Sequence, residues 1–198
     1  MQLKKIKRLF FLIFTIFLIN THLLASSKNF ISNLTSDASK ILASYENKDQ
    51  KMKQLVLLAE EHVDINGIGM YTLGKHRKTL SKEQIQEYKT LFRKYFLKSF
   101  SSRLSEYTDP KINVLSEEVI NNKYTIVFSV LEADENRPEV KIDWRVYTVN
   151  PEKPLVRDLI IEGLSLARTQ REEFNSVIQN GDGDIEVLFS NLKDFIKK

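Results

Sequence analysis

The sequence contains no cysteine, which excludes a disulfide framework and any metal or redox site built on thiolates. The same absence excludes the lipid-modified cysteine that would tether a lipoprotein to a membrane. Glycine and proline are scarce, with six and four among 198 residues, and no internal repeat or low-complexity tract interrupts the chain. We therefore expect one domain that is stabilised by side-chain packing alone.

Long apolar runs are also lacking, except for one near the N-terminus. Four basic residues, Lys4, Lys5, Lys7 and Arg8, precede a run from Leu9 to Ile19 that is apolar except for Thr15. These eleven residues are too few to cross about 30 Å of hydrocarbon as a helix, so a retained anchor is the disfavoured alternative. The layout is typical of a secretory signal peptide, residues 1–27, with cleavage near Ala25 or Ser27. It predicts a soluble mature protein, residues 28–198, in a bacterial periplasm.

The mature chain has no excess of charge of either sign. Residues 1–27 hold four of the 30 Lys and Arg residues and none of the 26 Asp and Glu residues, which leaves 26 of each. A neutral domain lacks the long-range field that gathers nucleic-acid phosphates or an anionic bilayer. The composition therefore argues against nucleic-acid binding and against adhesion through a polybasic patch.

Apolar residues at steps of three and four predict helices in the first half of the mature chain. One begins near Phe30, a second ends near Val63, and a short third spans about Asn66 to Gly74. Ser81 followed by Gln84 is typical of a capping box, and it opens the longest helix. One face of that helix is a stripe of large side chains at strict i+4 spacing, formed by Tyr88, Phe92, Phe96, Phe100 and Leu104.

After Asp109-Pro110 the apolar period changes from 3.6 to 2, which predicts strands. Four such runs, at 112–114, 124–131, 140–149 and 155–161, have short connections and predict a four-stranded antiparallel sheet. In the third run Val140, Ile142, Trp144 and Val146 alternate with polar residues and Tyr147, so helices should cover the first set. Beyond Gly163, one helix should end at Asn180-Gly181 and Asp184 should cap another. The order of helices, sheet and helices predicts an α+β fold.

The strongest candidate for catalysis is Gly163-Leu164-Ser165-Leu166-Ala167, which falls one residue short of a nucleophile elbow. A serine esterase that uses Ser165 is thus an alternative, but the two mature histidines, His62 and His76, precede the serine instead of following it. These histidines also lack metal-binding spacing, and the segment from Asp182 lacks the glycine at the sixth position and the glutamate at the twelfth position of a calcium loop. We expect Gly163 to turn the chain and Ser165 to cap or line a neighbouring element.

The aromatic stripe has two interpretations. A stripe at helical spacing usually forms ordinary core, in which case the protein is a lipid-free interaction module. The stripe is composed almost wholly of large residues, however, and the strands that face it offer Val127, Ile142, Trp144 and Val146. Large rings around a curved sheet leave a cavity that small interdigitating side chains would close, which favours a site for an apolar ligand.

Several segments resemble the MlaC family of periplasmic phospholipid-binding proteins. The first half matches at Leu73-Gly74-Lys75, at Ser81 to Gln84, and from Tyr88-x-x-x-Phe92 through Leu104-x-x-Tyr107. The second half matches at Val140-Lys141-Ile142-Asp143 and at Asp158 to Leu166, which resembles the signature Asp-(apolar)-x-x-Glu-Gly-(apolar)-Ser-(apolar), followed by Arg171 and Phe174. The similarity covers nearly the whole mature chain.

The resemblance implies an MlaC-like fold with an NTF2-like sheet that encloses an apolar lipid pocket. It implies a carrier, not an enzyme, that passes phospholipid between an outer-membrane lipoprotein complex and an inner-membrane ABC transporter with an MCE-domain ring. No metal or cofactor is implied, and a monomer is the simplest state for a shuttle. A hopanoid or another envelope lipid is the alternative cargo. This chain departs from the family at His76 and Arg77, where members commonly have aromatic residues, and at Pro154, where they have tryptophan.

Ten residues are the candidates for contact with the lipid tails. The positions of Leu73, Leu164 and Leu166 draw support from the matched motifs, and the others rest on periodicity. The full set is Tyr71, Leu73, Phe92, Phe96, Phe100, Leu104, Ile142, Trp144, Leu164 and Leu166.

Overall fold

The computed structural model describes residues 26–44, 47–135 and 137–198. The expected signal peptide, residues 1–27, lies outside the described residues except for Ser26 and Ser27. The helices are α2 (Ser27–Ser44), α3 (Lys48–His62), α4 (Ile65–Thr72), the 3-10 turn η1 (His76–Lys78), α5 (Lys82–Leu104), α6 (Leu166–Asn180) and α7 (Ile185–Lys197). The strands are β1 (Ile112–Asn121), β2 (Tyr124–Leu131), β3 (Val140–Tyr147), β4 (Leu155–Ile161) and β5 (Leu164–Ser165). The predicted α+β order is confirmed.

The sheet is antiparallel throughout and its strands follow the order of the chain. It has five strands where the sequence predicts four. The additional strand, β5, contains only Leu164 and Ser165, which pair with Ile161 and Ile160 after a tight turn. Two residues are too few to show a period of two, so the alternation of apolar side chains gives no sign of this strand.

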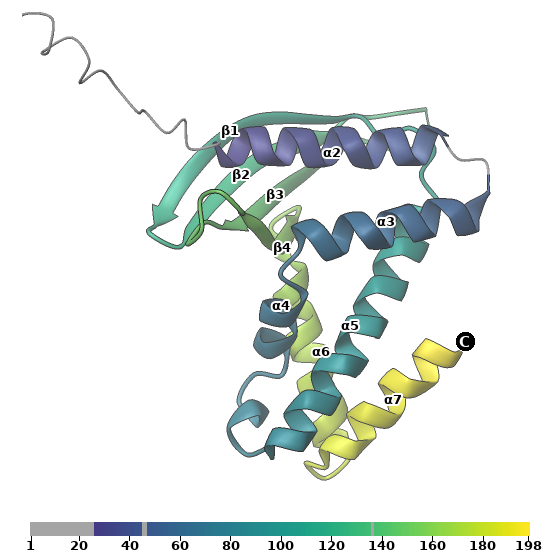
Figure 1. Cartoon of the computed structure of the whole chain (residues 1–198), viewed down its shortest axis with the longest axis vertical. Helices are drawn as coiled ribbons and strands as arrows, with labels where there is room; N and C mark the ends of the chain where they lie inside the picture. Colours follow the sequence, from purple (N-terminus) through teal and green to yellow (C-terminus); the bar gives the residue numbers. More distant parts are fainter. Residues whose placement is uncertain (1–25, 45–46, 136) are drawn as a thin grey trace, which may run out of the picture.

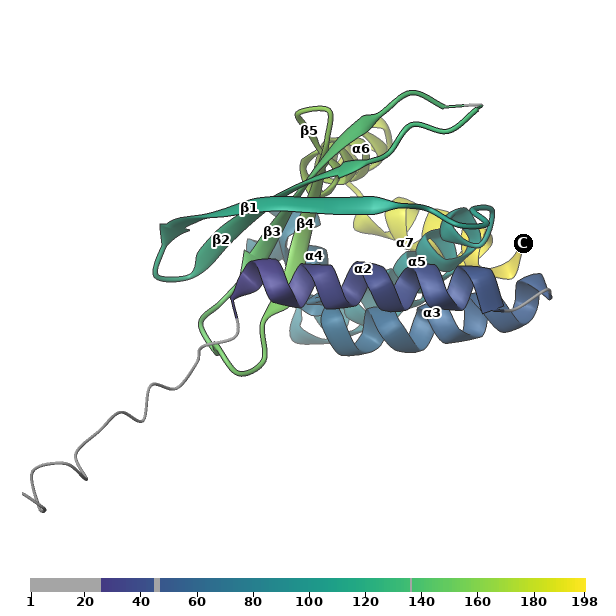
Figure 2. The same cartoon turned by 90° about the horizontal axis from the view of Figure 1, so that it is seen from above.

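Helix α2 covers the apolar face of the sheet, as Figures 1 and 2 show from two directions. Its residues Ile31 and Leu34 form a buried cluster with sheet residues Val127, Val146 and Val156, which we call the sheet cluster. The partners follow from the alternation in β3, since Val146 is buried while Lys141 and Arg145 on the opposite face are exposed. The predicted cover of this face by a helix is confirmed.

Helices α4 to α7 form a second body below the sheet in Figure 1. They share a larger buried group, the helical cluster, whose members are Ile65, Ile68, Leu73, Tyr88, Leu91, Phe92, Ala167, Phe174, Ile178, Ile185, Leu188, Phe189 and Leu192. The predicted helix starts are confirmed. Ser81 and Gln84 form the capping box of α5, and Asp184 caps α7.

The two bodies meet where α3 gives way to α4. Val63 forms a bridge with Val156 and packs against both clusters. The next residue, Asp64, accepts a hydrogen bond from Gly67 N at 2.8 Å, which caps α4, and is paired with Arg157 of β4 at 2.6 Å. The Arg157 guanidinium also lies 3.7 Å from the ring centre of Tyr147. The ion pair between Asp64 and Arg157 thus holds the start of the helical body on the sheet, and the ring of Tyr147 supports the arginine.

Candidate functional site

The aromatic stripe on α5 divides into two halves with different surroundings. Tyr88 and Phe92 are 0% and 2% exposed and belong to the helical cluster. Their ring centres are 5.8 Å apart, and the ring of Phe189 of α7 also stacks on Tyr88, with the centres 6.3 Å apart. The Tyr88 hydroxyl lies 2.8 Å from Oγ1 of Thr72, and burial raises the pKa of Tyr88 above its usual value. The first half of the stripe, which includes the candidate Phe92, is core.

The second half of the stripe, formed by Phe96, Phe100 and Leu104, is only partly buried. Phe96 packs at the border of the helical cluster, with its ring centre 6.1 Å from that of Phe92. Phe100 stacks on Phe96 at 5.8 Å with the ring planes 10° apart. The stripe thus continues beyond the core as two stacked rings and a leucine that stay only partly covered. Such a surface suits apolar ligand chains.

The candidates on β3, Ile142 and Trp144, point to the same face of the sheet as the buried Val146 but stay partly exposed. The indole Nε1 of Trp144 donates to Oγ of Ser129 at 2.9 Å. That hydroxyl donates in turn to the backbone oxygen of Ile142 at 2.7 Å. Because its polar group is satisfied within the sheet, the Trp144 ring presents an apolar surface at the border of the sheet cluster.

Phe96 and Trp144 therefore border two different apolar clusters. Val63 packs against both clusters, yet among the ring pairs of the described residues none joins Trp144 to the α5 aromatics. The structure places these candidates on either side of the boundary between the two bodies. It does not merge them into one continuous core.

The sheet register adds three residues that are not among the ten candidates for lipid contact. Leu131 pairs with Val140, and Ile142 pairs with Ile161, so all of them share the face of Ile142 and Trp144. Leu131, Val140 and Ile161 are partly exposed. The signal for them was present, because the alternation in the third run extends to its neighbours once the strand pairing is known. Together they extend the apolar surface toward one end of the sheet.

The remaining candidates separate into core and surface. Leu73 is 1% exposed within the helical cluster. Tyr71, Leu164 and Leu166 are 41%, 70% and 47% exposed. The guanidinium of Arg171 lies 5.2 Å from the ring centre of Tyr71. Leu164 pairs with Ile161 and so lies on the same face of the sheet as Ile142, at the β5 edge, whereas Tyr71 and Leu166 lie on the surface of the helical body.

The Glu-Gly-x-Ser motif builds the turn between β4 and β5. Glu162 and Gly163 have φ angles of 48° and 82°, the pair of positive values that a tight hairpin of the I′ class requires. A Cβ on Gly163 would have no atom within 4 Å, so the backbone angle and not space demands glycine there. Glu162 accepts a hydrogen bond from Lys141 N at 2.6 Å. The motif is explained by chain geometry.

Ser165 has a structural role in this turn. Its hydroxyl donates to Asp158 at 2.6 Å, and the same oxygen accepts from Arg168 N at 3.1 Å, which caps α6. The expected cap is confirmed. His76 instead contacts Asn175 at 3.1 Å, and His62 packs against the ring of Phe30. A hydroxyl that is paired with a carboxylate, and that neither of the described histidines contacts, is not arranged as an activated nucleophile.

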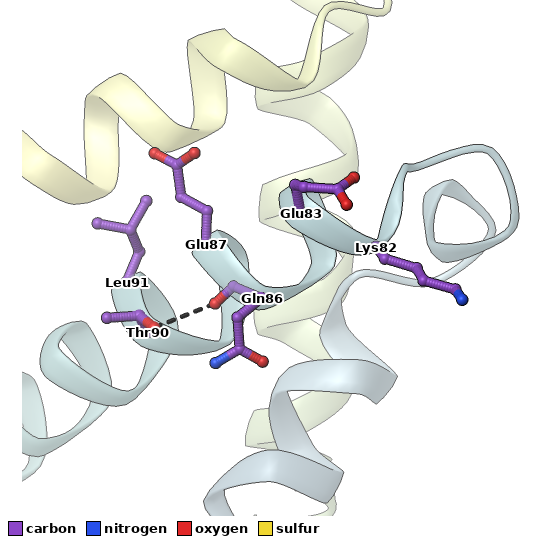
Figure 3. Close-up of a pocket in the computed structure, with 6 residues that line it drawn as sticks. All are labelled: Lys82, Glu83, Gln86, Glu87, Thr90 and Leu91. Carbon is purple, nitrogen blue, oxygen red and sulfur yellow. Dashed lines mark hydrogen bonds between the residues drawn. The ribbon is translucent and has the colours of Figure 1, made fainter.

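A shallow groove on α5 has the wrong chemistry for lipid tails (Figure 3). It is lined by Lys82, Glu83, Gln86, Glu87, Thr90 and Leu91. The Thr90 hydroxyl donates to the backbone oxygen of Gln86, and Glu87 is paired with Lys193 of α7 at 2.6 Å. Hydrogen bonds from its own backbone and from Ser81 lower the pKa of Glu83. We interpret this groove as an ordinary solvent-exposed surface of α5.

Neither metal chemistry nor a membrane span is indicated by the described part of the chain. Within it, no group of three His, Asp or Glu side chains has the geometry to hold a metal ion. No helix in residues 26–44, 47–135 or 137–198 combines the length and apolar character needed to cross a bilayer.

Comparisons with known proteins bear on the family and the fold. A family model described as MlaC protein matches residues 25–194. Among solved structures, the chain is similar to a phospholipid-binding protein from Ralstonia solanacearum in complex with a phospholipid, with a TM-score of 0.71 and 17% sequence identity. The match covers 87% of this chain and 97% of that one, and at this identity it concerns the fold. A search of curated proteins gives no significant match.

Proposed function

Because the chain belongs to the MlaC family, we propose that it is a periplasmic phospholipid carrier. It would move lipid between an outer-membrane lipoprotein complex and an inner-membrane ABC transporter with an MCE-domain ring, and so maintain outer-membrane lipid asymmetry. The signal-like segment before α2 supports export, and cleavage would free the carrier from its membrane tether. We keep the simplest assembly, a monomer, for such a shuttle.

The observation that carries the proposal is the division of the apolar interior into two clusters with half-buried rings at the border of each. A domain of this size normally has one contiguous core. Here Phe96 and Phe100 on one side, and Trp144 and Ile142 on the other, hold apolar surface that the fold itself leaves uncovered. Lipid tails between the two bodies would cover it.

The energy of tail exposure explains why a carrier is needed. Each CH₂ group is worth about 0.8 kcal/mol, so two chains of roughly sixteen carbons cost on the order of 25 kcal/mol to expose to water. Spontaneous passage of a phospholipid across an aqueous gap is therefore extremely slow. A carrier has only to shield the lipid tails from water, and this requires no catalytic group, metal or cofactor.

Analysis of the bound lipid tests the proposal directly. The protein is purified from the periplasm without detergent, extracted with organic solvent and examined by mass spectrometry. Phospholipid in stoichiometric amount is the expected result. A hopanoid or another envelope lipid would support the alternative cargo, and a consistently empty protein would refute the carrier and favour a lipid-free interaction module.

A further inference from the structure

Strand β2 has small polar side chains turned inward and large apolar ones turned outward. Thr125 and Ser129 point to the face that α2 covers and are 4% and 2% exposed. Ile126, Phe128 and Val130 point to the opposite face, where all three are partly exposed. An antiparallel strand with one solvated face normally carries polar residues on that face. The three outward residues therefore form an apolar column that the fold leaves uncovered.

The register of the sheet gives the neighbours of this column. Glu118 of β1 and Arg145 of β3 both pair with Ile126, so they lie in one row on either side of it. Both are exposed, and neither has an ion-pair partner in the described part of the chain. The rows of Phe128 and Val130 are built in the same way. We call the three rows the outer sheet face, and its members are Asn113, Ser116, Glu118, Ile126, Phe128, Val130, Lys141, Asp143 and Arg145.

The outer sheet face is open over β1 to β3 and bounded at β4. Helix α2 packs on the other side of the sheet, through Ile31 and Leu34. Asp158 of β4 pairs with Arg145, so its side chain points to the outer face, and there it accepts a hydrogen bond from Ala167 N at 3.0 Å. The first turn of α6 thus forms a wall along the β4 side of this face.

We propose that two copies of this chain associate through their outer sheet faces. A two-fold axis along β2 stacks the two apolar columns and brings β1 of each copy over β3 of the other. Each Glu118 then faces Arg145 of the second copy, because the two residues lie in the same row. Asp143 faces Ser116 and Lys141 faces Asn113, so like charges do not meet in these rows. Packed sheets lie about 10 Å apart, which glutamate and arginine side chains can span together.

The shape of the molecule fits the same axis. The wall at β4 lies two strands from β2, whereas β1 is the edge strand next to β2. The wall of each copy therefore falls outside the β1 edge of the other, and the surface is complementary to itself, as a two-fold contact requires. Three short rows make a small interface, so the dimer should dissociate on dilution into the monomeric carrier. Ile142 and Trp144 lie on the other face, so the dimer leaves the candidate lipid site uncovered.

Sedimentation equilibrium of the purified mature protein, from micromolar to near-millimolar concentration, tests the proposal. The wild type should pass from monomer to dimer and no further, because a two-fold contact is closed. Glu118→Arg or Arg145→Glu alone should raise the dissociation constant about tenfold, since each change places like charges together at two points of the interface. The two changes combined should restore association. Ile126→Thr, which keeps strand propensity but removes apolar surface, should also weaken the dimer about tenfold.

Matched variants on other surfaces serve as controls. Lys53→Glu reverses an exposed charge on α3, and Val119→Thr changes a side chain that is 71% exposed and points to the other face of the sheet. Both should associate like the wild type, and circular dichroism should show every variant folded. A monomer at all concentrations, equal losses in both sets, or no recovery in the combined reversal would overturn the proposal. Lipid extraction from the same preparations reports on the carrier function separately, because the lipid candidates on β3 lie on the opposite face.

Discussion

The carboxylate of Asp158 on β4 accepts a hydrogen bond from the hydroxyl of Ser165, with the two oxygens 2.6 Å apart. Its other oxygen accepts the backbone N–H of Ala167 at 3.0 Å, and Asp158 is 7% exposed. The aspartate and the serine of the signature thus act as one unit that ties the first turn of α6 to the sheet. Because this unit joins the two bodies of the molecule, it serves stability and the placement of α6.

Ser165→Ala should destabilise the protein without affecting any chemistry. The substitution removes the cap of α6 and one of the two hydrogen bonds to the buried Asp158, which together should cost about 2 kcal/mol. The melting temperature should fall by roughly 4–8 °C. Urea unfolding measures the change, and Ser176→Ala at an exposed position of the same helix is the control. Loss of an ester-hydrolysing activity with unchanged stability would instead revive the serine esterase.

Phe100→Asp should remove bound lipid while the fold survives. Phe100 is half-buried beyond the helical cluster, so a carboxylate there can reach water in the empty protein but would oppose a lipid tail. Lipid content by mass spectrometry should drop strongly, and the helical circular dichroism should persist. Phe92→Ala is the matched comparison, because Phe92 is core and its truncation should cost about 3–5 kcal/mol of stability. A loaded Phe100→Asp protein would exclude this ring from the lipid site.

The contrast between Phe92 and Phe100 also marks how far the sequence could predict the site. Contacts between residues close in the sequence could be predicted, as the capping box of Ser81 and Gln84 shows, because these partners lie three residues apart. The sequence did not predict which half of the stripe is buried. That depends on Phe189 of α7, which stacks on Tyr88 although it lies about a hundred residues further along the chain. The period of a helix identifies an apolar face, but only the tertiary partner decides which half of it is covered.

Leu73 and Leu164 make the same point for the matched motifs. Both positions belong to family-like segments, yet one is 1% and the other 70% exposed. The first follows α4 into the helical cluster, whereas the second projects from a hairpin whose direction is set by the backbone at Glu162 and Gly163. A motif preserves a backbone geometry, and the environment of each side chain follows from the packing around it.

Asp143→Asn should stabilise the protein slightly at neutral pH. Desolvation raises the pKa of Asp143, Lys141 nearby lowers it, and Glu162 raises it, with a net upward shift. A carboxyl group whose pKa is raised on folding disfavours the folded state while it is ionised, and this penalty disappears as the pH falls through the folded pKa. The variant should therefore melt above the wild type at pH 7, and the gain should shrink toward pH 3. Glu139→Gln, at an exposed position, should show no such pH-dependent gain. A gain that grows on acidification would contradict the sign of the shift.

Glu117 should hold the start of the mature chain on the sheet. Helix α2 has no acidic residue in its first turn, but Glu117 of β1 accepts from Lys28 N at 2.5 Å and from the Ser26 hydroxyl at 3.2 Å. Ser26 itself accepts from Asn29 N at 3.3 Å. Two of the free N–H groups of the first turn are thereby satisfied, one by a residue 89 positions away in the chain.

This arrangement predicts both a cleavage point and a stability effect. Cleavage after Ser27 would remove the Ser26 cap and the 7% exposed Ser27, whereas cleavage after Ala25 preserves every contact of the first turn. The intact mass of the exported protein should therefore correspond to a chain that begins at Ser26. Glu117→Gln should cost about 1 kcal/mol, because a neutral amide is a weaker partner for a helix N-terminus than a carboxylate. Glu118→Gln, on the opposite face of the same strand, should leave the melting temperature unchanged. A mature chain that begins at Lys28 and is insensitive to Glu117→Gln would show that α2 is held by its apolar face alone.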